Sequence, residues 1–204
     1  MSKNESLKIK EINISKNSIL LTRDVLEKIA PAIDKNNPRF ELNYLYVDNK
    51  YCIGTNTRIL TAFEHFENIT GCFYVHGELI IKALKERKAK EFILSHNKIE
   101  CVKDKEYNSI FSLEEHSLGS YVKYKAILED EKPHELPFYY KENITGLLLR
   151  EDIVIEPKYI PNFKEGVIKI KDSKKPICIE DGECKIKTII MPIVDVFSHY
   201  KGKS

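Results

Sequence analysis

The side chains that most often carry out catalysis are scattered along this chain. The six histidines contain no H-x-x-x-H or H-E-x-x-H spacing of a metal site, and neither a phosphate-binding loop nor a G-x-S-x-G nucleophile motif occurs. Asp181 and Glu183 flank a glycine in a predicted hairpin turn, where solvated carboxylates are expected more often than an acid–base pair. The sequence therefore predicts no catalytic residue, no metal site and no cofactor, and we expect a protein that is not an enzyme.

The cysteines and the chain termini indicate a compartment. The five cysteines are odd in number, contain no C-x-x-C pair and fall mostly in strand-like patterns. Small buried hydrophobes are expected at such positions. The N-terminal residues lead into no apolar stretch of the signal-peptide kind, and no run approaches the roughly 18 apolar residues of a membrane span. These features predict reduced thiols in a cytoplasmic protein.

A basic cluster is the feature that most suggests a ligand. It occupies a predicted helix at 77–90 (GELIIKALKERKAK) and consists of Lys82, Lys85, Arg87, Lys88 and Lys90. Such a cluster suits sequence-nonspecific contact with the phosphates of duplex DNA. A solvated helix face, with cations favoured near the helix C-terminus, explains the same pattern. Because the net charge is only +2, any DNA contact must come from a locally basic surface or from topology.

A repeated order of elements positions these residues: a short strand, a helix and then two or three strands. In the first copy, Thr22 is a suitable N-cap after a strand at 18–21, and Pro31 should end or kink the helix. The remaining strands are expected at 39–47 and 51–63 in the first copy, at 72–75, 91–95, 98–102 and 107–113 in the second, and at 152–155, 167–170, 176–179 and 185–193 in the third. The third copy also has a short predicted helix at 157–163, and Asp181-Gly182 is a strong hairpin signal.

The 204 residues suit one to two domains, and the apolar share of 42% is ordinary for a globular protein. The stretch 114–150 carries a weak pattern and reads as an extended connector with one strand at 144–149. We therefore predict a two-copy domain at 1–130, a connector at 131–151, and a C-terminal half-domain with a short tail at 152–204. The predicted fold class is α+β, with repeated helices packed on antiparallel sheets.

Several segments together resemble the bacterial DNA sliding clamp, the β subunit of DNA polymerase III. PRFELNYL at 38–45 and GTNTRIL at 54–60 are similar to the family's middle domain, and YVKYKAIL at 121–128 is similar to the segment that closes it. IIMPI at 189–193, preceded by PICI, is similar to the family's C-terminus. The likeness covers about 18–129 and 152–195 and implies a shortened clamp that lacks the first domain and half of the third.

This chain departs from the family's pattern at several positions. Tyr44 stands where the family has glycine, Asn56 where it has aspartate, Ile59 where it has arginine, and Glu129 where it has proline. These departures and the short length leave ring closure through the family's usual interface open.

The resemblance implies a processivity factor that encircles or contacts duplex DNA, with the basic helix facing the DNA. It also implies that DNA polymerase and other partner proteins dock through short peptides in an apolar groove. The matching groove positions are Thr55, Thr57, Arg58 and Leu60 on one wall, and Ile190, Met191, Pro192 and Ile193 on the other. Ordinary strand-core and turn residues would produce the same pattern.

Alternative functions remain open at this point. A clamp-like adaptor or decoy would keep the groove without encircling DNA, and an enzyme on an unrelated fold is the third possibility. A clamp requires a homo-oligomer. Three half-domains per chain give a tetramer if a ring needs twelve, and a trimer if the connector hides a degenerate fourth copy.

Overall fold

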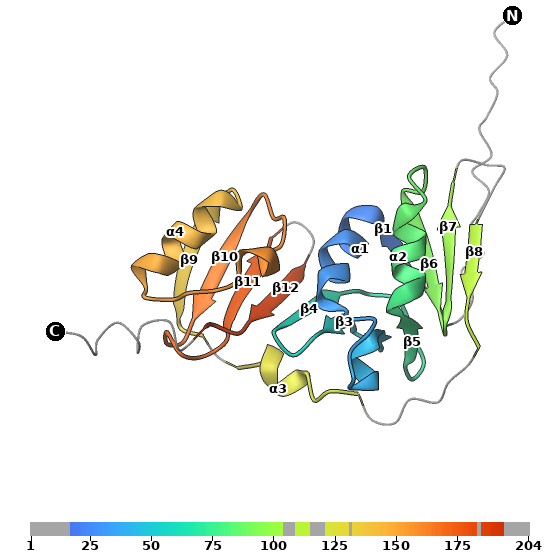
Figure 1. Ribbon diagram of the computed structural model, residues 1–204, viewed down its shortest axis with the longest axis horizontal. Coiled ribbons are helices and arrows are strands. Elements are labelled where there is room, and N and C mark those ends of the chain that lie inside the picture. Colours follow the sequence, from blue (N-terminus) through green and yellow to red (C-terminus); the bar gives the residue numbers. More distant parts are fainter. Residues whose placement is uncertain (1–16, 104–108, 115–120, 131, 183–184, 194–204) are drawn as a thin grey trace, which may run out of the picture.

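We describe the fold from a computed structural model, which describes residues 17–103, 109–114, 121–130, 132–182 and 185–193 (Figure 1). Within these residues, no helix is long and apolar enough to cross a membrane. The elements in chain order are β1 (Ile19–Thr22), α1 (Arg23–Ile29), β2 (Tyr44–Val47), β3 (Tyr51–Thr55), β4 (Ile59–Glu64), β5 (Phe73–His76), α2 (Gly77–Lys85), β6 (Glu91–Ser95), β7 (Lys98–Val102), β8 (Ser109–Ser112), α3 (Lys125–Leu128), β9 (His134–Tyr139), α4 (Glu142–Arg150), β10 (Glu165–Ile170), β11 (Ile177–Asp181) and β12 (Ile186–Ile190).

The first two repeats exchange their first strands. β1 pairs antiparallel with β6 of the second repeat, and β5 pairs antiparallel with β2 of the first. Each exchanged strand runs directly into its helix through an extended cap residue, Thr22 or His76, whose side chain accepts a hydrogen bond from the backbone N–H of Val25 or Glu78. The two repeats are therefore interlocked, and α1 and α2 contact each other.

The first helix ends where the sequence predicts. α1 stops at Ile29, and a 3-10 turn over Ala30–Ala32 follows it, because Pro31 has no N–H to continue the helical hydrogen bonds. The buried side chains of Val25, Leu26 and Ile29 lie on one face of α1 and join the main core. The helix predicted in the first repeat is confirmed over Arg23–Ile29.

The second helix is shorter than predicted, ending at Lys85 rather than at 90. The side chain of Arg23, at the start of α1, stabilises this end. Its guanidinium donates hydrogen bonds to the carbonyls of Leu84, Glu86 and Ala89, at 3.1, 2.7 and 2.8 Å. Arg23 thus binds the last turn of α2 at Leu84, its cap at Glu86 and the turn that follows at Ala89. Carbonyls at a helix end lack some intrahelical donors, and another element supplies donors here. The contact also shows that α1 and α2 run antiparallel, because the start of α1 meets the end of α2.

The strand predicted at 39–47 is also shorter in the structure. Phe40–Asn43 forms a 3-10 turn, and β2 begins only at Tyr44. The Asn43 side chain accepts a hydrogen bond from the backbone N–H of Asn37 at 2.8 Å. Such side-chain-to-backbone bonds compete with strand pairing and favour turns.

The expected connector over 131–151 is corrected by the structure. It contains strand β9 and helix α4, so the strand predicted at 144–149 is wrong. Ile144 and Leu148 are buried at helical spacing in α4, while Pro137 in β9 weakened the strand pattern. These elements complete the third repeat, so the described part of the stretch holds no fourth copy.

The remaining predictions for the third repeat hold in part. The strand predicted at 152–155 is absent from the described residues, although Ile153 and Ile155 are buried, and the predicted helix is reduced to a 3-10 turn over Pro157–Tyr159. β11 and β12 pair antiparallel from Asp181 opposite Ile186, as the hairpin signal predicts. The tail at 194–204 lies outside the described residues.

The third repeat joins the first through a single continuous sheet. β4 pairs antiparallel with β12, giving an eight-stranded sheet of order β5-β2-β3-β4-β12-β11-β10-β9, beside a four-stranded sheet of order β1-β6-β7-β8. In Figure 1 the third repeat occupies one end of the molecule and β8 the other. The joint between β4 and β12 positions the groove described below.

Candidate functional site: an apolar groove at the joint

A groove with a volume of about 270 Å³ opens beside the β4–β12 joint. At this place Leu60 lies opposite Ile189 in the sheet register, and the backbone N–H of Met191 donates to the carbonyl of Arg58 at 2.9 Å. Short α3 lies beneath the same joint in Figure 1. The residues that line the groove are Arg39, Leu42, Thr55, Thr57, Arg58, Ile59, Leu60, Val122, Ile127, Pro176, Ile189 and Met191.

The turn between β3 and β4 forms the first wall and is fixed by Asn56. Its side-chain oxygen accepts hydrogen bonds from the backbone N–H groups of Arg58 and Ile59, both at 3.1 Å. An aspartate at this position would accept in the same way, so the departure from the family's residue preserves the turn. Thr57 has φ +74, a left-handed conformation that is uncommon for a β-branched residue and needs such support.

Strand parity decides which predicted residues of the second wall reach the groove. Ile189 and Met191 lie on one side of the strand, and Ile190 points to the other side, where it is fully buried in the main core. Pro192 is buried and Ile193 is exposed, but neither lines the groove. Of the eight predicted positions, the structure brings together Thr55, Thr57, Arg58, Leu60 and Met191.

Leu60 and Met191 differ in burial, and this difference decides which of them is the better site for a substitution. Leu60 is 4% exposed and belongs to a core cluster, so it forms the floor of the groove and also stabilises the fold. Met191 is 42% exposed and stands at the groove edge. Substitution of Met191 therefore perturbs the groove with less damage to the core.

Sequence reasoning missed the groove residues on the segments flanking the two walls, among them Arg39, Leu42, Val122 and Ile127. Val122 and Ile127 lie in the segment that resembles the family's domain-closing stretch, so a signal for their region existed. Their approach to the groove depends on how that segment packs on the sheet, which local patterns do not reveal.

Two tyrosines hold the 121–128 segment against the sheet. The ring of Tyr121 stacks on Tyr46 at 4.7 Å between centroids, and its hydroxyl donates to the carbonyls of Tyr44 and Ile53. The hydroxyl of Tyr124 donates to the carboxylate of Asp48. Burial raises the pKa of both tyrosines, so both remain protonated donors at neutral pH. Val122 and Ile127 are thereby held at the groove.

The groove combines an apolar interior with cations at its rim. Arg58 is exposed, and exposed Arg39 forms an ion pair with Glu41 at 3.1 Å. The pKa of Glu41 is lowered by hydrogen bonding to its own backbone amide and by Arg39. This arrangement can bind a short peptide that places apolar side chains inside and an acidic or polar group at the rim.

The five predicted DNA-facing cations are all exposed and gather around the C-terminal end of α2. Lys82 forms an ion pair with Glu78 at 2.9 Å. Arg87, Lys88 and Lys90 lie beyond the helix, in the turn that Arg23 holds in place. The cluster is therefore a helix end and a turn, and not one continuous helical face.

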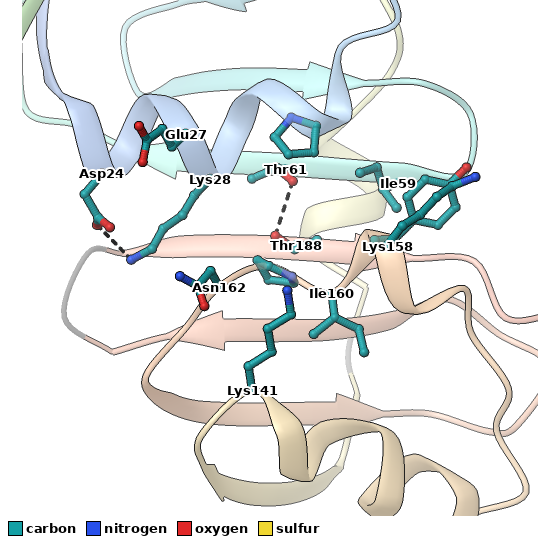
Figure 2. Close-up of a pocket in the computed structure, with 13 residues that line it drawn as sticks. Asp24, Glu27, Lys28, Ile59, Thr61, Lys141, Lys158, Ile160, Asn162 and Thr188 are labelled. Atoms are coloured by element: carbon teal, nitrogen blue, oxygen red, sulfur yellow. Dashed lines mark hydrogen bonds and ion pairs between the residues drawn. The ribbon is translucent and has the colours of Figure 1, made fainter. Parts of the chain in front are cut away.

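A second cavity, of about 190 Å³, lies on the α1 side of the same joint (Figure 2). At the joint the hydroxyls of Thr61 and Thr188 are 3.2 Å apart, and Lys28 forms ion pairs with Asp24 at 2.8 Å and Asp181 at 2.7 Å. The Lys28–Asp181 pair is buried and connects the first repeat to the third. We assign this cavity a structural role in holding the joint.

Most of the described cysteines are buried. Cys52, Cys101 and Cys178 are buried and Cys72 is exposed, while Cys184 lies outside the described part. Burial raises the pKa of the Cys101 thiol to about 11 and that of Cys178 to about 12, which keeps both as unreactive thiols. In the described part of the chain, no group of three or more His, Cys, Asp or Glu side chains could hold a metal ion.

The interlocked repeats, the helices on antiparallel sheets and the joint between repeats define the fold of the bacterial DNA sliding clamps. Solved structures with this fold include the Helicobacter pylori β clamp in complex with carprofen, at a TM-score of 0.63 and 16% identity, covering 86% of this chain and 66% of that chain. The Pseudomonas aeruginosa sliding clamp aligns at a TM-score of 0.59 and 11% identity, covering 87% and 66%. The Helicobacter pylori clamp bound to a DNA ligase peptide aligns at 0.61 and 18%, covering 86% and 65%.

These likenesses confirm the predicted fold class. At such identities they establish the fold alone, and the chain spans about two thirds of the length of the clamps it matches. No family model and no curated protein matches the sequence.

Proposed function

We propose that this protein is a clamp-like replication scaffold that contacts duplex DNA and docks partner proteins through the groove at the β4–β12 joint. The observation that supports the proposal is the groove itself. Two segments far apart in the sequence, the β3–β4 turn and the end of β12, meet there to form an apolar slot with a cationic rim.

The comparison with solved clamps supports the docking part of the proposal. One of the clamps with this fold binds a DNA ligase peptide. We infer that DNA polymerase or other clamp-binding proteins present peptides of the same kind to this chain. The proposed role is binding and not catalysis.

The DNA part of the proposal rests on topology and weak phosphate contact. A ring that encircles DNA needs no strong basic excess, which is compatible with a net charge of +2. We propose that several copies of the chain assemble into that ring, with the exposed cations at the end of α2 facing the DNA. A clamp-like adaptor that uses the groove without encircling DNA is the second candidate, and the groove supports it equally because it is formed within one chain.

Met191→Asp tests the docking proposal. Covering the exposed part of Met191 contributes about 1 kcal/mol, and a carboxylate beside an apolar peptide side chain costs a further ~1–3 kcal/mol, so we expect peptide affinity to fall at least tenfold. Binding is measured by fluorescence anisotropy with a labelled clamp-binding peptide.

Ile193→Asp is the matched control. Ile193 is 43% exposed, almost the same as Met191 at 42%, and is two residues away, but it does not line the groove. We expect wild-type affinity in this variant. Equal affinity of all three proteins for the peptide would remove the groove as the docking site.

A further inference from the structure

The first two repeats show how a complete pair of repeats is built in this chain. In each, the strand before the helix continues straight through an extended residue, with φ and ψ of −73° and 160° at Thr22 and −63° and 137° at His76. Each of these strands pairs with the sheet of the other repeat. Helices α1 and α2 then lie antiparallel and in contact.

Among the described residues the third repeat has no such partner, and it folds back on itself. β9 pairs with β10 of its own repeat, and the chain reverses at Tyr140, which has φ +88. A left-handed backbone is strained for an aromatic residue. Lys141, the residue before α4, provides no side-chain cap, unlike Thr22 and His76. Tyr140 is thus a strained chain reversal, and the first two repeats have an extended residue at the corresponding place.

The same repeat exposes a surface that corresponds to the α1–α2 contact. Helix α4 carries an exposed stripe at helical spacing, consisting of Glu142, Gly146, Leu149 and Arg150. Leu149 is 53% exposed, and the neighbouring Tyr139 of β9 is 66% exposed. Between α4 and β9 lies a hollow of about 380 Å³, lined in part by Pro137, Tyr139 and Leu147.

We propose that a second copy of this chain covers this surface, with each copy donating β9 to β10 of the other. Two third repeats would then form an interlocked pair like the first two. β9 would occupy the same place in the sheet that β5 occupies beside β2, so its pairing with β10 is conserved and only the hinge at Tyr140 changes conformation. Exchange of an identical element is a low-cost route to a dimer.

The α4 stripe is complementary to itself in this arrangement. If two copies of α4 run antiparallel, as α1 and α2 do, Glu142 in the first turn of one copy meets Arg150 in the last turn of the other. Gly146 lies midway between them, and a side chain there would meet nothing within 4 Å in the single chain. A glycine inside a helix is unfavourable by itself, but it allows another helix to approach closely.

This inference deepens the assembly part of the proposed function and rests on it. The dimer contains six repeats, half of the twelve expected in a ring, and two such dimers supply all twelve. The two copies of the edge strand β8 lie at the ends of the dimer. The groove is formed within one chain, so peptide binding does not depend on the exchange.

Hinge variants of the full chain provide the first test, with mass followed by analytical ultracentrifugation from low to high micromolar concentration. Glycine adopts φ +88 without strain, so Tyr140→Gly should favour the back-folded single chain. Because the dimer contains two such hinges, its association constant should fall about tenfold for each of them. Tyr140→Val disfavours that conformation further and should strengthen dimerisation. The proposal is overturned if wild type is a strict monomer at high micromolar concentration, or if the two variants shift the equilibrium in the same direction.

Surface variants test the location of the interface. Leu149→Glu should reduce the dimer at least tenfold, because it places a carboxylate in the α4 stripe beside Glu142 of the other copy. Ile110→Glu is the matched control, since Ile110 on β8 is 55% exposed but lies at the opposite end of the molecule. If Ile110→Glu dissociates the dimer and Leu149→Glu does not, the interface lies on β8 and the proposal is wrong.

A disulfide between facing strands tests the exchange itself. Glu135 and Lys169 are Cα partners in the β9–β10 register, so Glu135→Cys with Lys169→Cys can form a disulfide. The background carries Cys72→Ser and Cys184→Ser. After oxidation at high concentration, a denaturing gel without reductant should show covalent dimers. Monomers with an internal disulfide from a sample of dimeric mass would overturn the exchange.

Peptide binding in the same samples separates this inference from the proposed function. Leu149→Glu should keep wild-type peptide affinity while losing the dimer. Loss of peptide binding in Met191→Asp with the dimer intact is the complementary result. The strand exchange and the proposed peptide binding can therefore fail independently, and the two failures give different results.

Discussion

Replacement of Lys28 by methionine tests whether a buried ion pair holds the first and third repeats together. The ammonium group of Lys28 lies 2.7 Å from the carboxylate of Asp181, and the two side chains are 9% and 4% exposed. Removing one partner of a buried pair costs about 3–5 kcal/mol, because the other charge loses its counter-ion away from water. Methionine keeps most of the apolar stem, so we expect a loss of about 3 kcal/mol in the free energy of unfolding.

The structure offers a control with nearly the same geometry and different burial. Lys82 lies 2.9 Å from Glu78, but the two side chains are 45% and 46% exposed. Exposed helical pairs of this kind contribute only about 0.3–0.5 kcal/mol, so Lys82→Met should have little effect. Urea unfolding followed by circular dichroism measures both variants against wild type.

A double variant separates the loss of the pair from the cost of the remaining charge. Lys28→Met combined with Asp181→Leu removes both charges, and apolar replacement of a whole buried pair is often close to neutral. We expect the double variant to recover at least about 2 kcal/mol of the loss. If Lys28→Met and Lys82→Met destabilise the protein equally, burial of the joint pair is not the source of its strength.

Three further predictions concern DNA, acid stability and helix ends. Replacing Lys85, Arg87 and Lys88 together by glutamate should abolish retention on circular DNA in a salt-sensitive assay without changing the circular dichroism spectrum, and unchanged retention by an intact ring would exclude this surface. Burial lowers the pKa of His65, so the unfolded state binds the proton more readily, and the free energy of unfolding should fall as the pH drops below about 6.5. His65→Phe should flatten the plot of unfolding free energy against pH between about 5 and 7, and an unaltered slope would contradict this cause. Arg23→Met removes the donors to the carbonyls of Leu84 and Glu86 at the end of α2 and of Ala89 in the turn beyond, and it should cost about 2–3 kcal/mol. A loss below about 0.5 kcal/mol would show that water satisfies those carbonyls equally well.

Much of the local structure was predictable from the sequence because its signals are short-range. Thr22 as N-cap, Pro31 as the end of α1 and Asp181-Gly182 as a hairpin act through neighbouring residues, and all three are found in the structure. The repeated order of elements predicted the fold class. The order and spacing of several weak motifs together led to the clamp resemblance, whose fold is confirmed.

The misassigned connector has a physical cause. β9 contains a proline and alternates poorly, and its pairing with β10 supplies the order that its own sequence does not indicate. Helix α4 has apolar residues at helical spacing, but Gly146 and Thr145 lower its intrinsic propensity. Both elements are stabilised by contacts with residues far along the chain.

The sequence by itself determined the repeat, the ends of several helices and strands, and about half of the candidate groove. These features depend on side-chain periodicity and on hydrogen bonds between near neighbours. The end of α2 at Lys85 is stabilised by tertiary contacts, since Arg23 of another element binds the carbonyls of Leu84 and Glu86. Tertiary structure also decided that Ile189 and Met191 face the groove while Ile190 enters the core, because the pairing of β12 with β4 fixes which face of the strand is buried.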